Sequence, residues 1–162
     1  MTELRSQMNI RRFTNDIKTC IDNGILCNVN NDDDYKLTVN LVGPDDTPYE
    51  KKIFAISIYI PTKYPMQPPD IKFITPIFHP NISTTGKICL DILGNEWSSA
   101  LKLYDVIISI QSLLNEPNAD SPLNAEAARL YKISYKKNAT NEEKNLYHSY
   151  CNEYHNNIKY KK

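Results

Sequence analysis

The stretch that decides the fold is residues 78–97, FHPNISTTGKICLDILGNEW. Its His79-Pro80-Asn81 triplet cannot continue a helix, because a residue before proline is pushed toward extended geometry and Pro80 has no backbone N–H to donate. The polar residues after the triplet are typical of an exposed turn. An apolar run that contains Cys89 follows this turn. The spacing therefore predicts a loop in which the thiol of Cys89 returns past His79 and Asn81.

These residues resemble the active-site segment of the ubiquitin-conjugating enzymes. The resemblance rests on His-Pro-Asn at 79–81, on Cys89 eight residues after Asn81, and on the Leu-Asp-Ile-Leu and Trp-Ser sequences that follow. It extends over about residues 11–154, which is most of the chain. It implies an enzyme that accepts ubiquitin from the ubiquitin-activating enzyme as a thioester on Cys89. The enzyme then transfers ubiquitin to a lysine of a protein substrate, usually with a ubiquitin ligase, and needs no cofactor and no metal.

Length and composition fit one globular domain. The chain has 162 residues, of which 41% are hydrophobic and 23% are charged, and this size suits a single hydrophobic core. The expected catalytic domain spans 1–162, with a core at about 10–155 and a loose leader at 1–9. The formal net charge is zero, so no bulk attraction to nucleic acid or to a membrane is implied.

Cysteine usage indicates a reducing environment. The four cysteines are scattered along the chain, which favours neither a disulfide framework nor a zinc site. Cys20 and Cys27 fall on apolar stripes, so we expect core thiols there rather than reactive ones. The sequence shows no apolar run of membrane-spanning length and no secretory leader. We therefore expect a monomer in the cytoplasm, the nucleus or both.

Hydrophobic periodicity predicts strands in the first half of the chain. Apolar residues alternate with polar ones at 35–42 and at 53–60, and a short apolar segment follows at 71–74. A polar turn is expected at 30–34. Because the connections are short, the strands should form an antiparallel meander of about four strands.

Helices are predicted on both sides of these strands, which gives an α+β fold. A helical stripe at 10–21 predicts a first helix that ends at Gly24. The segments 104–115 and 124–132 predict a buried central helix and a shorter helix capped by its Asn. Thr140 opens a last helix. The apolar residues assigned to that last helix are Leu146, Tyr150 and Tyr154.

The chemistry expected at this loop is acyl transfer. A thiolate at Cys89 can be acylated, and a primary amine can then attack the thioester. The attack creates a developing oxyanion, and the side-chain NH2 of Asn81 is a candidate donor to it, since one such donor contributes about 3 kcal/mol. In the family this Asn has that role, or else it holds the loop in place. His79, beside a proline, is more often a structural hydrogen-bonding residue than a base.

The attacking lysine must first lose a proton, because its unperturbed pKa is about 10.4. The enzyme should desolvate the amine or offer it an acceptor. Candidates are Asp91, two residues after Cys89, and the loop around Asp120 and Ser121. Many family members have Asp where Ser121 stands. A phosphate on Ser121 would add about −1.5 to −2 charges beside the thioester, so we hypothesise a control point there; the alternative is an ordinary turn serine.

The resemblance also implies residues that contact the activating enzyme and the ligase. In the family, basic residues of the first helix contact the activating enzyme, and Arg11 and Arg12 match that position; a solvated basic face is the alternative. The proline-rich loop at 61–69 and the loop after Trp97 dock ubiquitin ligases. The matching residues in these two loops are Met66, Ser98 and Ala100. Many members have an aromatic residue in place of Met66, which leaves the choice of ligase open.

Contacts with ubiquitin itself are implied in the same way. Asn118 and Leu123 match positions that line the groove for the ubiquitin tail. Ile108 and Ser112 match positions on the helix that can pack against bound ubiquitin. The bond between prolines 68 and 69 resembles one that is cis in the family, so we expect a cis bond there.

Three other functions stay open at this point. A cysteine hydrolase would need the imidazole of His79 aimed at the sulfur and an oxyanion hole open to a peptide. An inactive variant that only binds ubiquitin would lack the cysteine, whereas Cys89 is present. An enzyme for another modifier, such as SUMO, would carry insertions in the sheet region that this sequence does not show. Within the family, residues 109–131 are most similar to the enzymes that serve the cell-cycle ligase complex and DNA-damage tolerance.

Overall fold

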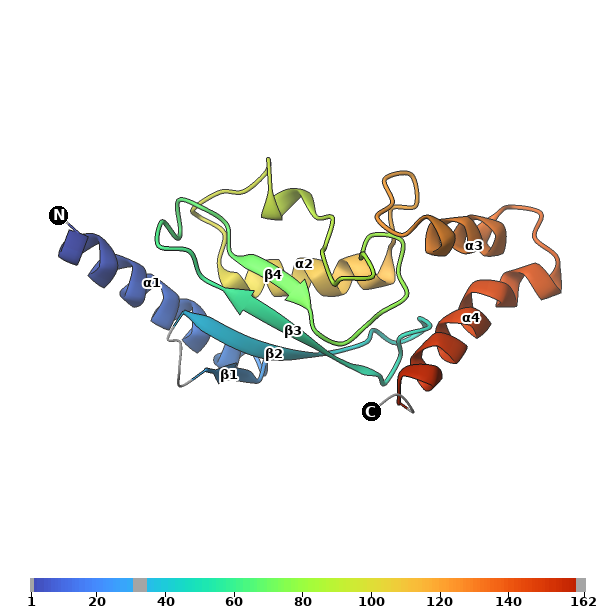
Figure 1. The fold of residues 1–162 in the computed structure, drawn as a ribbon, viewed down its shortest axis with the longest axis horizontal. Coiled ribbons are helices and arrows are strands. Elements are labelled where there is room, and N and C mark those ends of the chain that lie inside the picture. The colour runs from blue at the N-terminus through green and yellow to red at the C-terminus, as the bar shows by residue number, and fades with distance from the viewer. Residues whose placement is uncertain (1, 31–34, 160–162) are drawn as a thin grey trace.

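The computed structural model describes residues 2–30 and 35–159, which form an α+β fold (Figure 1). The elements follow in the order α1 (Thr2–Asp22), β1 (Cys27–Val29), β2 (Lys36–Val42), β3 (Ile53–Tyr59), β4 (Asp70–Phe73), the short 3-10 helix η1 (Asp91–Leu93), α2 (Leu103–Asn115), α3 (Ala125–Tyr135) and α4 (Asn141–Lys159). None of the helices in these ranges is long and apolar enough to cross a membrane.

The four strands form one antiparallel sheet in the order β1-β2-β3-β4, as predicted. Val39 of β2 lies opposite Ile56 of β3, and Ile56 lies opposite Phe73 of β4. All three side chains are buried, because alternate residues of a strand point to the same face of the sheet. The short strand β1 had no predicted range. The turn predicted at 30–34 lies, apart from Asn30, outside the described residues.

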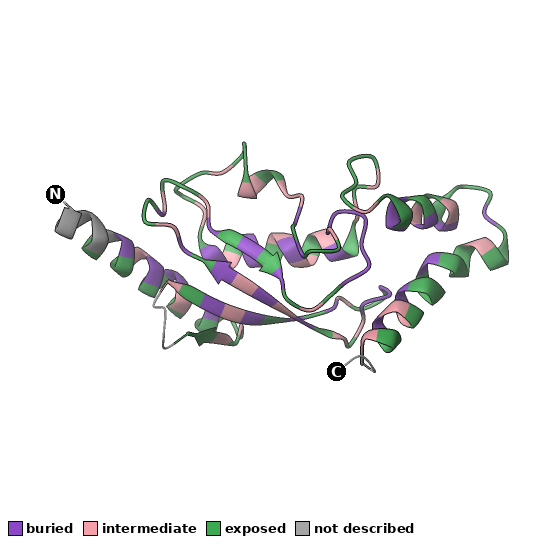
Figure 2. Ribbon diagram, in the orientation of Figure 1, coloured by how far each residue is buried: buried purple, intermediate pink, exposed green. Residues whose placement is uncertain are grey.

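The core lies between the inner face of the sheet and α2. Val106, Ile107 and Ile110 of α2 are fully buried, and Figure 2 shows buried positions along the strands and along this helix. α1 lies at one end of the molecule, whereas α3 and α4 lie together at the other end (Figure 1). The central helix predicted at 104–115 is therefore confirmed, with its start one residue earlier.

The first helix begins earlier than predicted. α1 starts at Thr2 rather than at residue 10, so the expectation of a loose leader before residue 10 was wrong for the residues from Thr2 on. Asn9 is buried, and its Nδ2 donates to the carbonyl oxygens of Pro61 at 3.2 Å and Thr62 at 3.0 Å. These two polar contacts join α1 at Asn9 to the proline-rich loop.

The buried face of α1 is shorter than predicted. Phe13 and Cys20 are buried, but Ile10 and Ile21 are 49% and 55% exposed. The predicted stop is confirmed at Gly24. Its φ of 82° lies in the left-handed region that favours glycine. Cys27 is only half-buried, at the start of β1.

The proline-rich loop contains its cis bond at Tyr64–Pro65, not at the predicted Pro68–Pro69. The N–H of Met66 donates to the carbonyl of Lys63 at 2.7 Å. This bond closes a four-residue turn with a proline at its third position, and a turn of that kind contains the proline in cis. The sequence prediction therefore placed the cis bond at the wrong proline.

Both C-terminal helices begin with the predicted caps. Asn124 precedes α3, and its Oδ1 accepts the N–H of Ala127 at 3.1 Å. At α4, the N–H of Glu143 donates to Oγ1 of Thr140 at 3.2 Å, and Oε2 of Glu143 accepts the N–H of Thr140 at 2.9 Å. This reciprocal pair is a capping box.

The apolar face of α4 differs from the prediction. Among its described side chains, Tyr147, Cys151 and His155 are buried, and the predicted Tyr154 is half-buried against the core. The predicted Leu146 and Tyr150 are instead 39% and 41% exposed. Residues 147, 151 and 155 recur every four positions, so they share one helix face. The helix thus turns a mixed face of tyrosine, cysteine and histidine toward the body of the molecule.

Candidate active site

Cys89 lies beside Asn81 in a loop that folds back on itself. The N–H of Cys89 donates to the carbonyl of Asn81 at 2.9 Å. The intervening turn contains Gly86, whose φ is 87°, and a Cβ at this position would lie 2.1 Å from the carbonyl oxygen of Phe73. Only glycine therefore fits the close approach of this turn to β4. The predicted return of the thiol past Asn81 is confirmed.

His79 is buried and uses both of its ring nitrogens. Nδ1 accepts the N–H of Asn81 at 3.0 Å, and Nε2 lies 2.9 Å from the carbonyl of Leu113 in α2. The first bond requires a bare Nδ1, so Nε2 carries the hydrogen and donates it to Leu113. Burial lowers the pKa of His79 to about 4, because desolvation disfavours the imidazolium. His79 thus fastens its loop to α2 and has no free nitrogen to offer Cys89.

The side chain of Asn81 is buried and joins two loops. Its Oδ1 accepts the N–H of Asn118 at 2.8 Å, and its Nδ2 donates to the carbonyls of Asn118 at 2.7 Å and Ser121 at 3.1 Å. A further bond runs from the N–H of Leu123 to the carbonyl of Pro80 at 2.8 Å. Both hydrogens of the Asn81 amide are therefore used to hold the loop at 116–124.

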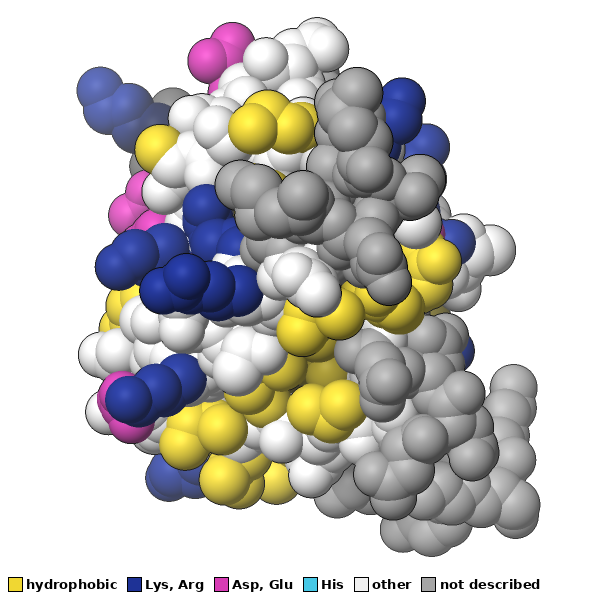
Figure 3. Space-filling view, turned by 90° about the vertical axis from the view of Figure 1, so that its left-hand side faces the viewer, with side chains coloured by type: hydrophobic (Ala, Val, Ile, Leu, Met, Phe, Trp, Pro, Cys, Tyr) yellow, Lys and Arg dark blue, Asp and Glu magenta, His cyan; other side chains and the backbone are white. Residues whose placement is uncertain are grey.

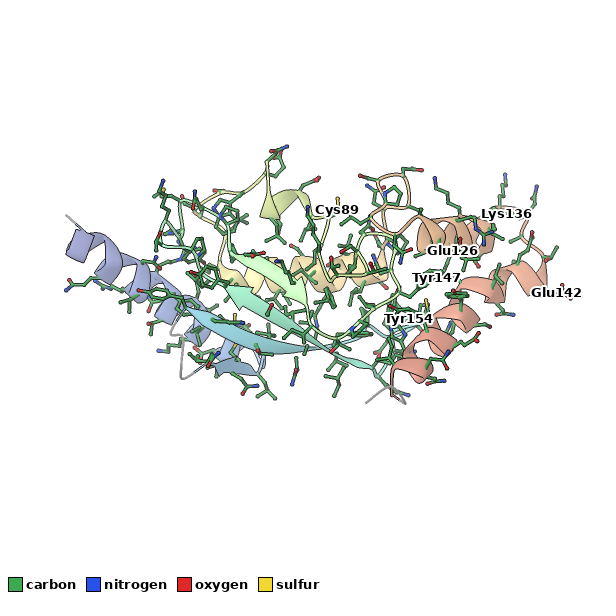
Figure 4. The ribbon with its side chains drawn as sticks, in the orientation of Figure 1. Cys89, Glu126, Lys136, Glu142, Tyr147 and Tyr154 are labelled. Atoms are coloured by element: carbon green, nitrogen blue, oxygen red, sulfur yellow. The ribbon has the colours of Figure 1, made fainter. Side chains whose placement is uncertain are left out.

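The thiol of Cys89 is half-buried on the wall of an open depression of about 510 Å³. Lys87, Asp91, Glu96 and Leu123 are among the residues that line it. Figure 4 shows Cys89 at the surface, between η1 and the loop that precedes α3. Two sequence candidates, Asp91 and Leu123, therefore lie in the same depression as the thiol.

The other candidates of the loop before α3 lie around Asn81. Asn118 and Ser121 are exposed, and the N–H of Ser121 donates to the carbonyl of Asn118 at 3.3 Å. The carboxylate of Asp120 is turned toward α3, where it lies 2.9 Å from Nζ of Lys132. Of the two acidic candidates, Asp120 is therefore ion-paired, whereas Asp91 lines the depression of the thiol.

Ile108 and Ser112 lie on the exposed side of α2, away from the buried face of this helix. Ile108 is 38% exposed. Together with Val42, both residues line a separate open depression of about 530 Å³. The two groups of residues that the resemblance assigns to ubiquitin therefore line two different surfaces, one at the thiol and one on α2.

Arg12 is bound within the molecule. Its Nε lies 3.0 Å from the carboxylate of Asp16, and its two terminal nitrogens donate to the carbonyls of Ser99 at 2.8 Å and Leu101 at 2.6 Å. The guanidinium therefore joins α1 to the loop after Trp97. Arg11, its neighbour, is exposed, so the predicted solvated basic face applies to Arg11 and not to Arg12.

The two loops assigned to ligases lie side by side. Nε1 of Trp97 donates to the carbonyl of Pro65 at 2.9 Å. Met66 is 75% exposed, and Ser98 and Ala100 are exposed as well. At the α1 end of the molecule, apolar side chains form a band with Lys and Arg gathered beside it (Figure 3). The structure thus brings the sequence-predicted ligase residues together at this end.

Sequence reasoning missed the contacts that hold Phe78, the residue before His79. The hydroxyl of Tyr49 donates to the carbonyl of Phe78 at 2.6 Å, the hydroxyl of Tyr147 bonds to that of Tyr49, and Sγ of Cys151 lies 3.7 Å from the same carbonyl. Figure 4 shows Tyr147 pointing from α4 into the molecule. No local pattern marks this network, because Tyr49 and Tyr147 are 98 residues apart.

Within residues 2–30 and 35–159, no three His, Cys, Asp or Glu side chains are grouped so that they could hold a metal ion. The family model described as ubiquitin-conjugating enzyme matches residues 5–159, a range that holds every candidate residue of the site. This chain belongs to the ubiquitin-conjugating enzyme family.

Proposed function

We propose that this protein accepts ubiquitin from the activating enzyme as a thioester on Cys89 and transfers it to a substrate lysine together with a ligase. The family supports a ubiquitin-conjugating role. The assignment of the thioester to Cys89 is supported by the position of this residue. Cys89 is half-buried in an open depression, and its N–H donates to the carbonyl of Asn81. By contrast, Cys20 and Cys151 are fully buried, so ubiquitin could not reach their thiols.

In the charging step, the sulfur of Cys89 attacks the C-terminal carbonyl carbon of ubiquitin, which the activating enzyme presents as a thioester. The new carbon–sulfur bond forms on Cys89, and the bond to the activating enzyme breaks. The departing thiolate takes up the proton that Cys89 loses. Energy stored in the first thioester is therefore kept in the second.

In the transfer step, the amine of the substrate lysine attacks the thioester carbon and the thiolate of Cys89 leaves. The amine must give up a proton, and a group beside the thioester is needed to accept it. Of the two acidic candidates from the sequence, Asp91 lines the depression of the thiol, whereas the carboxylate of Asp120 is turned toward Lys132 of α3. We therefore assign this role to Asp91. Ser121 is exposed at the edge of this region and would be a weaker acceptor.

We assign to Asn81 the role of holding the loop at 116–124 in the resting enzyme. Its amide already donates to the carbonyls of Asn118 and Ser121. To stabilise an oxyanion, the amide would have to release one of these bonds during the reaction. The loop-holding role needs no such rearrangement, and it keeps Leu123 next to Cys89.

The partners in this proposal are ubiquitin, an activating enzyme, a ligase and protein substrates, and the compartment is the cytoplasm or the nucleus. The four cysteines are free thiols, in keeping with a reducing compartment. A cysteine hydrolase is the weaker candidate, because both ring nitrogens of His79 are engaged and a hydrolase needs an imidazole directed at its thiol.

The test is a charging reaction with ubiquitin, activating enzyme and ATP, followed by a non-reducing gel. We expect a band one ubiquitin heavier that disappears with reductant and is absent in Cys89→Ala. Cys27→Ala is the matched control, because this half-buried thiol lies in β1, and it should keep the band. A folded protein that forms no such band would overturn the proposal, and the same reaction would then be run with other modifiers.

A further inference from the structure

Two of the four cysteines lie together where the chain passes from α1 to β1. Cys20 is in the last turn of α1, and Cys27 is the first residue of β1. Both are free thiols, and their side chains hydrogen-bond to each other. Neither residue lines the depression at Cys89, so this pair of thiols is a separate feature of the molecule.

The turn between the two cysteines holds them together. Gly24 has a φ of 82°, and its N–H donates to the carbonyl of Ile21 at 2.9 Å. The N–H of the next residue, Ile25, donates to the carbonyl of Cys20 at 2.9 Å. These two bonds across a left-handed residue form a Schellman motif. The chain turns back at this motif, which places β1 against the end of α1 and Cys27 against Cys20.

The two thiols differ in their access to solvent. Cys20 is fully buried, whereas Cys27 is half-buried. β1 is a strand of three residues at the edge of the sheet, and both of its other residues are exposed. A dissolved oxidant can therefore reach Cys27. Because the strand is short and lies at an edge, it can also move by the small distance that brings two hydrogen-bonded sulfurs to the disulfide length of about 2.04 Å.

The hydrogen bond gives the two thiols different roles. It lowers the pKa of Cys27, because the S–H of Cys20 stabilises a thiolate there. The same bond, together with burial and the nearby charges of Asp16 and Asp105, raises the pKa of Cys20. The thiolate is the reactive form of cysteine, so Cys27 is the sulfur that reacts first, and Cys20 remains a thiol beside it.

We propose that Cys20 and Cys27 form a redox-active pair that hydrogen peroxide converts into an intramolecular disulfide. The thiolate of Cys27 attacks one peroxide oxygen, the O–O bond breaks, and Cys27 becomes a sulfenic acid. The departing hydroxide takes up the proton that Cys27 had given to solvent. The sulfur of Cys20 then attacks the sulfur of Cys27, the S–S bond forms, and the S–O bond breaks. The second hydroxide leaves as water with the proton of Cys20.

The electrons balance in this sequence, since the peroxide gains the two electrons that the two sulfurs lose. The product joins the end of α1 covalently to the edge of the sheet. In a reducing compartment such a disulfide is transient and serves redox sensing, because a dithiol reductant returns both cysteines to thiols. This reactivity of Cys27 was not predicted from the apolar pattern of the sequence, and it does not depend on the chemistry of Cys89.

The test is peptide mapping of the full chain after treatment with hydrogen peroxide. The remaining thiols are blocked with N-ethylmaleimide in acidic denaturant, and trypsin then releases both cysteines in one peptide, residues 19–36. We expect this peptide to have lost two hydrogens and to carry no maleimide, and to regain both thiols when dithiothreitol is added before blocking. The buried Cys151 is the internal control and should carry its maleimide throughout.

Variants separate the reacting thiol from the resolving one. Cys20→Ser keeps a hydroxyl donor beside Cys27 but cannot close the disulfide, so dimedone should trap at least tenfold more sulfenic acid on Cys27 than in the wild type. In Cys27→Ala, the buried Cys20 should stay a thiol at the same dose of peroxide.

Three results would each overturn the proposal. The first is a wild-type peptide that keeps both maleimides at a dose of peroxide that oxidises Cys89. The second is equal trapping by dimedone in the wild type and in Cys20→Ser. The third is oxidation of Cys20 in Cys27→Ala.

Discussion

Asn81 and Asn118 bond to each other twice. The N–H of Asn118 donates to Oδ1 of Asn81 at 2.8 Å, and Nδ2 of Asn81 donates back to the carbonyl of Asn118 at 2.7 Å. A third bond joins Asn81 to the carbonyl of Ser121 at 3.1 Å. The side chain of Asn81, together with the carbonyl of Pro80, therefore holds the loop that carries Leu123 to the depression of Cys89. The sequence leaves two roles open for Asn81, which are to hold this loop and to donate to an oxyanion. Replacing Asn81 has a different expected result for each role.

Replacing Asn81 with Ala should loosen this loop and slow transfer together. Loss of three hydrogen bonds, each worth about 1 kcal/mol, should raise hydrogen exchange at the amides of Ser121 and Leu123 at least tenfold. Discharge of ubiquitin to free lysine should fall as well, because the loop that carries Leu123 would no longer be held at the depression of Cys89. Asn145→Ala, at an exposed position in α4, should change neither. Slower discharge with unchanged exchange would instead assign Asn81 to the oxyanion alone.

Arg11 and Arg12 should behave differently although they are neighbours. Arg12→Ala removes bonds to Asp16, Ser99 and Leu101 and should lower the free energy of unfolding by about 1–3 kcal/mol. Arg11→Ala removes an exposed charge and should leave stability within about 0.5 kcal/mol. Urea unfolding measures the free energy of unfolding of both variants. Charging rates at several concentrations of activating enzyme show which substitution weakens binding to that enzyme. Equal stability of the two variants would contradict the structure.

Stability should fall as the pH is lowered from 7 to 5. The pKa values of His79 and His155 are lowered to about 4 by burial, from an ordinary value of 6.5. Between about pH 6.5 and 4 the unfolded chain therefore binds more protons than the folded one, and acid favours unfolding. Each histidine should contribute about 2 kcal/mol over this interval.

Urea unfolding at pH 7, 6 and 5 measures this dependence. His155→Gln should remove about half of it, because it leaves only one of the two buried histidines. If that variant kept the full dependence on pH, the assignment of His155 as a buried neutral imidazole would be wrong.

Several parts of the site follow from local sequence, and others do not. The approach of Cys89 to Asn81 could be predicted because Pro80 forbids a helix and Gly86 permits the turn, and both signals lie within the loop. The bonds of Arg12 could not be predicted, since its partners Ser99 and Leu101 lie 87 and 89 residues away. A basic residue on a helix gives no local sign of such a role.

The same limit explains the errors at α4 and in the proline-rich loop. Tyrosine suits both buried and exposed positions, so the pattern alone could not tell the buried Tyr147 from Tyr150. The proline-rich loop contains four prolines, and the local sequence does not indicate which of them follows the cis bond. The proline that does, Pro65, is also the one contacted by a residue from outside the loop. That contact is the hydrogen bond that Trp97 donates to the carbonyl of Pro65.

Ser121 should control the rate of transfer if a negative charge there affects the incoming amine. The side chain is exposed in the loop that Asn81 holds, so a phosphate can be accommodated without repacking. We expect Ser121→Asp to change the rate of lysine discharge several-fold and to shift its dependence on pH, while Ser121→Ala stays closer to the wild type. The measurement is single-turnover discharge from pH 7 to 10. Wild-type rates for both variants would show that Ser121 is only a turn residue.

The measurement that tests the central claim most directly replaces the sulfur of residue 89 by oxygen. After charging with ubiquitin, the wild-type adduct should be cleaved by reductant, whereas the adduct of Cys89→Ser should resist reductant and be cleaved by alkali, as an oxygen ester is. That result would place the acyl group on residue 89. An adduct that reductant cleaves in both proteins would place it on another cysteine and would contradict the assignment of Cys89.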